Sequence, residues 1–107
     1  MGLQEALDQL VEAIKESDIY KEYRRQSERV DRISGMREKI NEYRARTYEL
    51  QNNTRAEELL DRMEAFEVEY EAFREEPVVE EYLSAEVAFC RLMQETEVKL
   101  AEAVDFE

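Results

Sequence analysis

Apolar residues recur at alternating three- and four-residue steps along almost the whole sequence, and this period limits the possible folds more than any other feature. Residues at that spacing fall on one side of an α-helix. The 107 residues include only two glycines and one proline, so the chain is poor in turn-forming residues and rich in residues that tolerate helix. The sequence therefore predicts an all-α fold and argues against a sheet.

Interruptions of this rhythm divide the chain into four or five expected helices. The first runs from about Leu3 to Ile14 and buries its leucine side, and Ser17 and Asp18 are N-cap candidates for the second. Gly35 is expected to break the pattern after the second helix, because glycine can take the left-handed conformation that closes a helix.

The later breaks predict an antiparallel hairpin and one long final helix. The third helix covers about residues 36–50, and Thr54 with Glu57 forms a capping box that starts the fourth. The residue before Pro77 is biased away from helical angles, and proline suits a first helical position. The last helix is therefore expected over about residues 77–104. We expect all 107 residues to form a single domain.

The last expected helix is apolar over roughly 260° of its circumference when its residues are placed at 100° steps. A helix with so wide an apolar arc must be covered on several sides. It is either the central helix of the bundle or partly covered by another molecule, and we favour both, which predicts a homo-oligomer. The residues expected on the oligomer or partner face are Tyr82, Leu83, Val87, Phe89, Cys90 and Met93.

The charge balance disfavours nucleic acid and membranes as partners. The chain has 28 Asp and Glu against 15 Lys and Arg, a net charge of −13, which repels a phosphate backbone and an anionic bilayer. No apolar run approaches the roughly 20 residues that cross a membrane. Met1–Asp8 carry acid where an export signal needs basic and then apolar residues, so we expect a cytoplasmic protein.

The residues for common catalytic and cofactor chemistry are missing. The sequence has no histidine, and its glycines, Gly2 and Gly35, are too far apart for a phosphate-binding loop. Glu64, Glu67 and Glu71 form a row at helical spacing that could chelate a hard cation, but a solvated helix face is the better interpretation. We therefore predict no enzymatic activity, no metal site and no cofactor.

Cys90 and Glu86 are the two residues of the last helix that invite a functional interpretation. Cys90 lies on the apolar arc, where a free cysteine usually behaves as a small hydrophobic residue; a cluster shared between chains stays open. Glu86 lies inside the arc, where an unpaired carboxylate is costly. We expect either a pair between Glu86 and Arg44 that fixes the register of two helices, or a Glu86 side chain that reaches solvent.

Several segments resemble the YlbF/YmcA family of small helical bacterial regulators. They are Glu16–Tyr23, Ile40–Arg44 leading to Glu49–Gln51, and Glu76–Glu86, and they follow one another in order and spacing over nearly the whole chain. The resemblance implies an all-helical, hairpin-like fold that self-associates. It also implies hetero-complexes that influence RNA processing by a membrane-tethered endoribonuclease, and through it competence, biofilm formation and sporulation.

Two functions are compatible with these features. The first is a non-enzymatic regulatory adaptor, homo-oligomeric and bound to other regulatory proteins. The alternative is an acidic coiled-coil-like module that sequesters a single basic partner through its charge. Some family members carry cysteines in a C-terminal tail and are linked to iron-sulfur clusters, whereas the one cysteine here lies inside the last expected helix.

Overall fold

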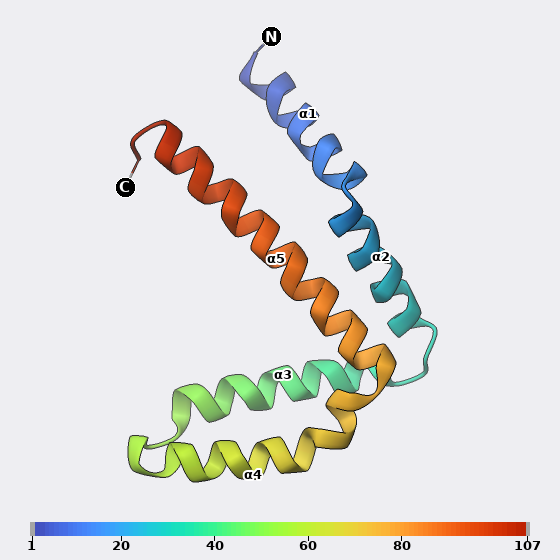
Figure 1. The fold of residues 1–107 in the computed structure, drawn as a ribbon, viewed down its shortest axis with the longest axis vertical. Helices are drawn as coiled ribbons and strands as arrows, with labels where there is room; N and C mark the ends of the chain where they lie inside the picture. The colour runs from blue at the N-terminus through green and yellow to red at the C-terminus, as the bar shows by residue number, and fades with distance from the viewer. Residues whose placement is uncertain (1, 107) are drawn as a thin grey trace. The chain divides into compact units, whose positions relative to one another are not determined.

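The computed structural model describes residues 2–106 and is helical over nearly all of them (Figure 1). Within that range there is no strand, and five helices follow one another: α1 (Leu3–Glu16), α2 (Asp18–Asp31), α3 (Met36–Asn53), α4 (Ala56–Glu75) and α5 (Pro77–Ala103). The predicted all-α fold, with four to five helices and a long last one, is confirmed.

A single serine ends α1 and begins α2. The Ser17 hydroxyl donates to the carbonyl of Ile14 at 2.6 Å and accepts the backbone N–H of Tyr20 at 3.2 Å. It thereby satisfies one unpaired group at each helix end, which is the capping role expected of serine at this position.

Gly35 separates α2 from α3 because of its backbone angles. Its φ of 76° and ψ of −3° lie in the left-handed region, which residues with a Cβ rarely adopt. A Cβ built at this position would meet nothing within 4 Å, so the requirement for glycine is conformational and not steric. The predicted break is confirmed.

The expected capping box at the start of α4 is wrong. Thr54 is the C-cap of α3, and Arg55 occupies the N-cap of α4 without a side-chain cap. The Arg55 carbonyl accepts the Glu58 N–H at 3.0 Å. Because the helix begins one residue later than expected, Thr54 and Glu57 are not in the N-cap and N3 positions that the box requires.

The chain divides into two compact units. One contains the residues up to Ser27 together with those from Tyr82 onward, and the other is Glu28–Glu81. In the second unit α3 and α4 lie side by side as an antiparallel hairpin (Figure 1). The expectation that the whole chain is one domain stays a prediction.

Few apolar side chains are fully covered. Those buried among the described residues are Val30, Met36, Ile40, Val78, Val79, Tyr82 and Ala85. Helix α1 has no buried residue: Leu3 is 88% exposed and Leu7 48%. The expected burial of the leucine side of α1 is therefore wrong for the isolated chain, because an apolar stripe is buried only where another element lies against it.

Candidate protein-binding surfaces

An aromatic cluster holds the α3–α4 hairpin together. The ring of Tyr43 on α3 lies 5.7 Å from Phe66, 5.1 Å from Tyr70 and 5.7 Å from Phe73, measured between centroids. The three partners are on α4 at three- and four-residue spacing, so they share one side of that helix. Such ring pairs stabilise by about 0.5–1.5 kcal/mol beyond the area that they bury.

Arg46 adds a polar clamp one turn along α3. Its guanidinium donates to both carboxylate oxygens of Glu69, at 3.1 Å for Nη2 to Oε1, and to the hydroxyl of Tyr70 at 2.9 Å. It also lies 5.6 Å from the centroid of Phe66 and 5.1 Å from that of Tyr70, within cation–π range. The sequence pattern did not predict this clamp, because its members lie on two helices and the period of one helix does not reveal their register.

The clamp shifts the pKa values of both ionised groups. The hydrogen bond to Arg46 holds the pKa of the Glu69 carboxyl below its ordinary value, and the bond to Glu69 raises the pKa of Arg46. A carboxyl whose folded-state pKa is depressed stabilises the fold above its unfolded pKa. That contribution is lost as the pH falls through the folded-state value.

Glu69→Gln is therefore expected to destabilise the protein near neutral pH and to make little difference in acid. The gap in melting temperature between the wild type and the variant should close as the pH falls from roughly 6 to roughly 3. Thermal melts followed by circular dichroism at several pH values measure the gap. Glu67→Gln, an exposed carboxyl on the same helix, is the matched control. A gap that stayed constant with pH would rule out the charged clamp as its cause.

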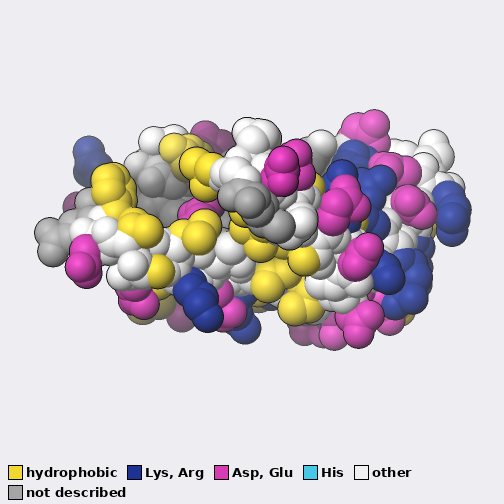
Figure 2. Space-filling view, turned by 90° about the horizontal axis from the view of Figure 1, so that it is seen from above, with side chains coloured by type: hydrophobic (Ala, Val, Ile, Leu, Met, Phe, Trp, Pro, Cys, Tyr) yellow, Lys and Arg dark blue, Asp and Glu magenta, His cyan; other side chains and the backbone are white. Residues whose placement is uncertain are grey.

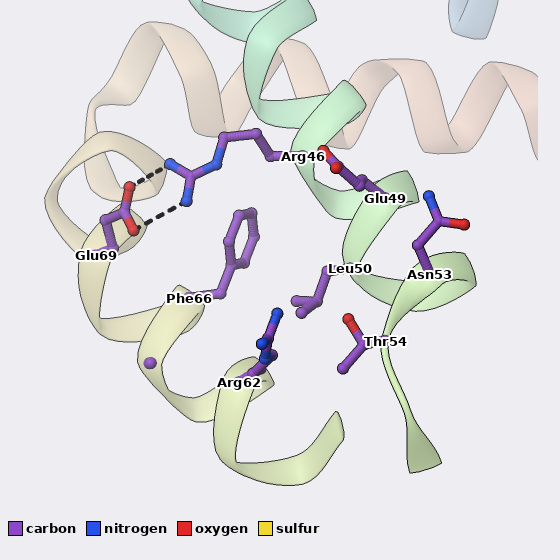
Figure 3. Close-up of a pocket in the computed structure, with 9 residues that line it drawn as sticks. Arg46, Glu49, Leu50, Asn53, Thr54, Arg62, Phe66 and Glu69 are labelled. Carbon is purple, nitrogen blue, oxygen red and sulfur yellow. Dashed lines mark hydrogen bonds and ion pairs between the residues drawn. The ribbon is translucent and has the colours of Figure 1, made fainter. Parts of the chain in front are cut away.

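A pocket of about 370 Å³ opens beside the clamp, between the end of α3 and the start of α4 (Figure 3). Its lining includes Leu50 and Phe66 as apolar groups, with Arg62, Asn53 and Thr54 around them. The two lining arginines are matched by two lining glutamates, so the pocket has no net charge to select a charged ligand.

The aromatic residues of the expected partner face turn toward α2. Tyr82 is 1% exposed, and its ring lies 6.1 Å from Tyr23. Phe89 stacks on Tyr23 at 5.2 Å and meets Tyr20 edge-on at 5.4 Å. The rings of Tyr82 and Phe89 therefore pack against other rings within the first unit.

The remaining residues of that face are more open. Leu83 is half-buried, Val87 is 54% exposed, Met93 is 36% exposed, and Cys90 is exposed. A role of this face in an interface stays a prediction, and these four side chains are the ones that retain surface for it.

Glu86 has a partner on its own helix. The Tyr82 hydroxyl donates to Glu86 Oε2 at 3.4 Å, and the Glu86 side chain is half-buried. Arg44 is half-buried on α3, in the other unit. Pairing of Glu86 with Arg44 stays a prediction.

Aliphatic side chains are exposed on both α1 and α5 in the first unit, among them Leu3 and Leu7, which were expected to be buried. The exposed side chains are Leu3, Leu7 and Val11, which share one side of α1, and Val87, Val98 and Leu100 on α5, and they are 39–88% exposed. At 100° steps, Leu100 lies on the opposite side of α5 from the two valines. Figure 2 shows hydrophobic side chains that reach the surface among charged side chains of both signs. Exposed aliphatic side chains are available for contact with another protein.

Comparison with known proteins decides the family. A family model described as "Control of competence regulator ComK, YlbF/YmcA" matches residues 3–105. The chain belongs to this family. A "UPF0342 protein" from Caldicellulosiruptor bescii is 22% identical over 101 residues, which cover 92% of this chain and 85% of the relative. No solved structure matches.

Membership of the YlbF/YmcA family confirms the resemblance inferred from the sequence. The family is described by its control of the competence regulator ComK, so this chain is a member of a regulatory family. Among the described residues, no helix combines the length and the hydrophobicity needed to span a lipid bilayer.

Proposed function

We propose that this chain is a non-enzymatic regulatory adaptor, which associates with copies of itself and with other regulatory proteins. By resemblance, its complexes modulate bacterial RNA processing and with it competence, biofilm formation and sporulation. Membership of a family that controls a competence regulator supports a regulatory role. The observation that carries the proposal is the set of exposed aliphatic side chains on α1 and α5.

The exposed aliphatic side chains of α1 and α5 supply part of the apolar area that self-association needs. A fully exposed aliphatic side chain offers roughly 100 Å² of apolar area, so these six offer roughly 340 Å² per copy. A standard interface buries about 800 Å² per partner, of which about 60% is apolar. A second copy provides the same aliphatic side chains, as a two-fold interface requires.

Charge and composition support the rest of the proposal. The net charge of −13 opposes binding to nucleic acid and to anionic membranes, which leaves proteins as partners. The single cysteine of the sequence cannot form a disulfide within the chain, which suits a reducing compartment, and we place the adaptor in the cytoplasm.

Light scattering tests self-association. We expect the wild type to be a dimer or higher oligomer at micromolar concentration, and Leu100→Glu to shift it toward the monomer with an unchanged helical circular dichroism spectrum. Val68→Glu is the matched control, because Val68 is 73% exposed but lies on α4 in the other unit. A wild type that is monomeric at micromolar concentration would contradict the proposal. So would a Val68→Glu variant that dissociates as much as Leu100→Glu.

A second candidate function is sequestration of one basic partner, which the net charge favours. The two functions respond differently to salt. Binding through exposed charges weakens steeply as the ionic strength rises, whereas binding through apolar helix faces changes little. Partners recovered from the native host by affinity purification, washed at low and at high salt, would separate the two.

A further inference from the structure

Helix α4 carries nearly half of the net charge of the chain. It has eight Asp and Glu against two Arg, a net of −6 out of −13. Placed at 100° steps, six of the acidic residues share one side with Leu60 and Val68, opposite the ring cluster. They are Glu57, Asp61, Glu64, Glu67, Glu71 and Glu75, all exposed.

The apolar residues on this side are unusually open to solvent. Leu60 is 68% exposed and Val68 is 73% exposed. They are separated by two turns, so one partner element running along α4 can contact both. This side of α4 is therefore an acidic helix face with two exposed apolar side chains.

A groove of about 770 Å³ runs along the same side, within the second unit. Its walls are Glu64, Glu67, Val68, Glu71, Arg74 and Glu75 from α4 and Glu80 from the first turn of α5. The lining contains five carboxylates and one guanidinium, together with the valine. Its charge selects a cationic occupant, and its valine favours one that also has an apolar side chain.

The spacing of the carboxylates fits a long cationic element better than a metal ion. Glu64 and Glu75 are separated by roughly 16 Å along the helix axis at 1.5 Å per residue. Among residues 2–106, no group of His, Cys, Asp or Glu is placed so that it could hold a metal ion. A helix with Lys or Arg on successive turns matches such a row, because its side chains repeat at the same interval.

We propose that the α4 groove docks a cationic amphipathic helix of a partner protein. Lys or Arg side chains of that helix pair with Glu64, Glu67 and Glu71, and an apolar side chain between them covers Val68. This inference rests on the proposed function in that the partner is a protein, and it adds the chemistry of the partner and the surface that receives it. Acidic walls speed the encounter and set the orientation, while the apolar contact slows dissociation.

The probe for this proposal is a labelled synthetic peptide of about 18 residues with arginines on one helical side and leucines beside them. Its control is a scrambled peptide of the same composition without the helical period. Fluorescence anisotropy with the full chain should show binding of the amphipathic peptide at least about tenfold tighter than binding of the scrambled one. Equal binding of the two peptides would overturn the proposal, since it would mean unspecific charge attraction.

Charge-reversal variants test whether the peptide binds at the α4 groove. Glu67→Lys with Glu71→Lys should weaken binding by more than about tenfold, whereas Glu97→Lys with Glu102→Lys, the same charge change on α5, should alter it by less than about threefold. Val68→Ser should weaken binding without changing any charge. Equal losses from the two charge reversals, or no loss from Val68→Ser, would overturn the α4 groove as the docking site.

The same variants separate this inference from the proposed function. The Leu100→Glu variant should no longer self-associate but should still bind the peptide. The variant with Glu67→Lys and Glu71→Lys should no longer bind the peptide but should still self-associate. If the wild type is monomeric but binds the peptide at the groove, the α4 inference stands and the proposed self-association fails.

Discussion

Tyr82→Ala should lower the melting temperature by roughly 10–20 °C, the shift expected when a large buried side chain is removed from a chain of this size. Tyr82 is 1% exposed, its ring lies against Tyr23, and its hydroxyl bonds to Glu86. Tyr48→Ala, on α3, removes the same side chain from a position that is 68% exposed. It should leave the melting temperature within about 2 °C of the wild type.

Thermal melts followed by circular dichroism, together with light scattering, check this expectation. Tyr82→Phe keeps the ring and removes only the hydroxyl, so it should cost about 1 kcal/mol. If Tyr82→Ala melted like the wild type but no longer self-associated, Tyr82 would belong to an interface between copies and not to the interior.

Ile40→Ala should reduce the free energy of unfolding by about 2–5 kcal/mol. Ile40 is fully buried on α3, so the change removes methylene groups from a packed site and leaves a cavity. Ile19→Ala is the matched control, because Ile19 is 40% exposed on α2 and the same atoms are removed.

Urea denaturation measures both free energies. The midpoint for Ile40→Ala should fall well below that for Ile19→Ala, with similar slopes for the two variants. Equal losses would mean that Ile40 is no better packed than a half-exposed residue. A lower slope for Ile40→Ala alone would mean that the variant has lost part of its compact structure before the main transition.

The helix boundaries were predictable because local residues set them. Ser17, Gly35 and Pro77 each act through groups within one turn of the chain, by capping, by a left-handed φ and by a fixed φ respectively. The capping box failed because it depends on which of two neighbouring residues first takes helical angles. That choice differs by one position between the expected and the observed start of α4.

The binding surfaces were predicted less well. Helical period identified the apolar side of α1 but placed Leu3 and Leu7 in the core, whereas both are open to solvent. For α5 it identified the wide apolar arc without separating Tyr82, which turns inward, from Val87, which does not. A period shows which residues share a side of a helix, but not whether another element lies against that side.

The Arg46–Glu69 clamp could not be found in this way, because its two members are 23 residues apart on antiparallel helices. Their meeting depends on the register set by Tyr43 and the three rings of α4. By itself, the sequence determined an all-helical chain, the order and ends of its helices, its acidic charge and its family. Only the tertiary structure decided which apolar sides are covered and which charges pair across helices, because burial and pairing depend on distances between segments that are remote along the chain.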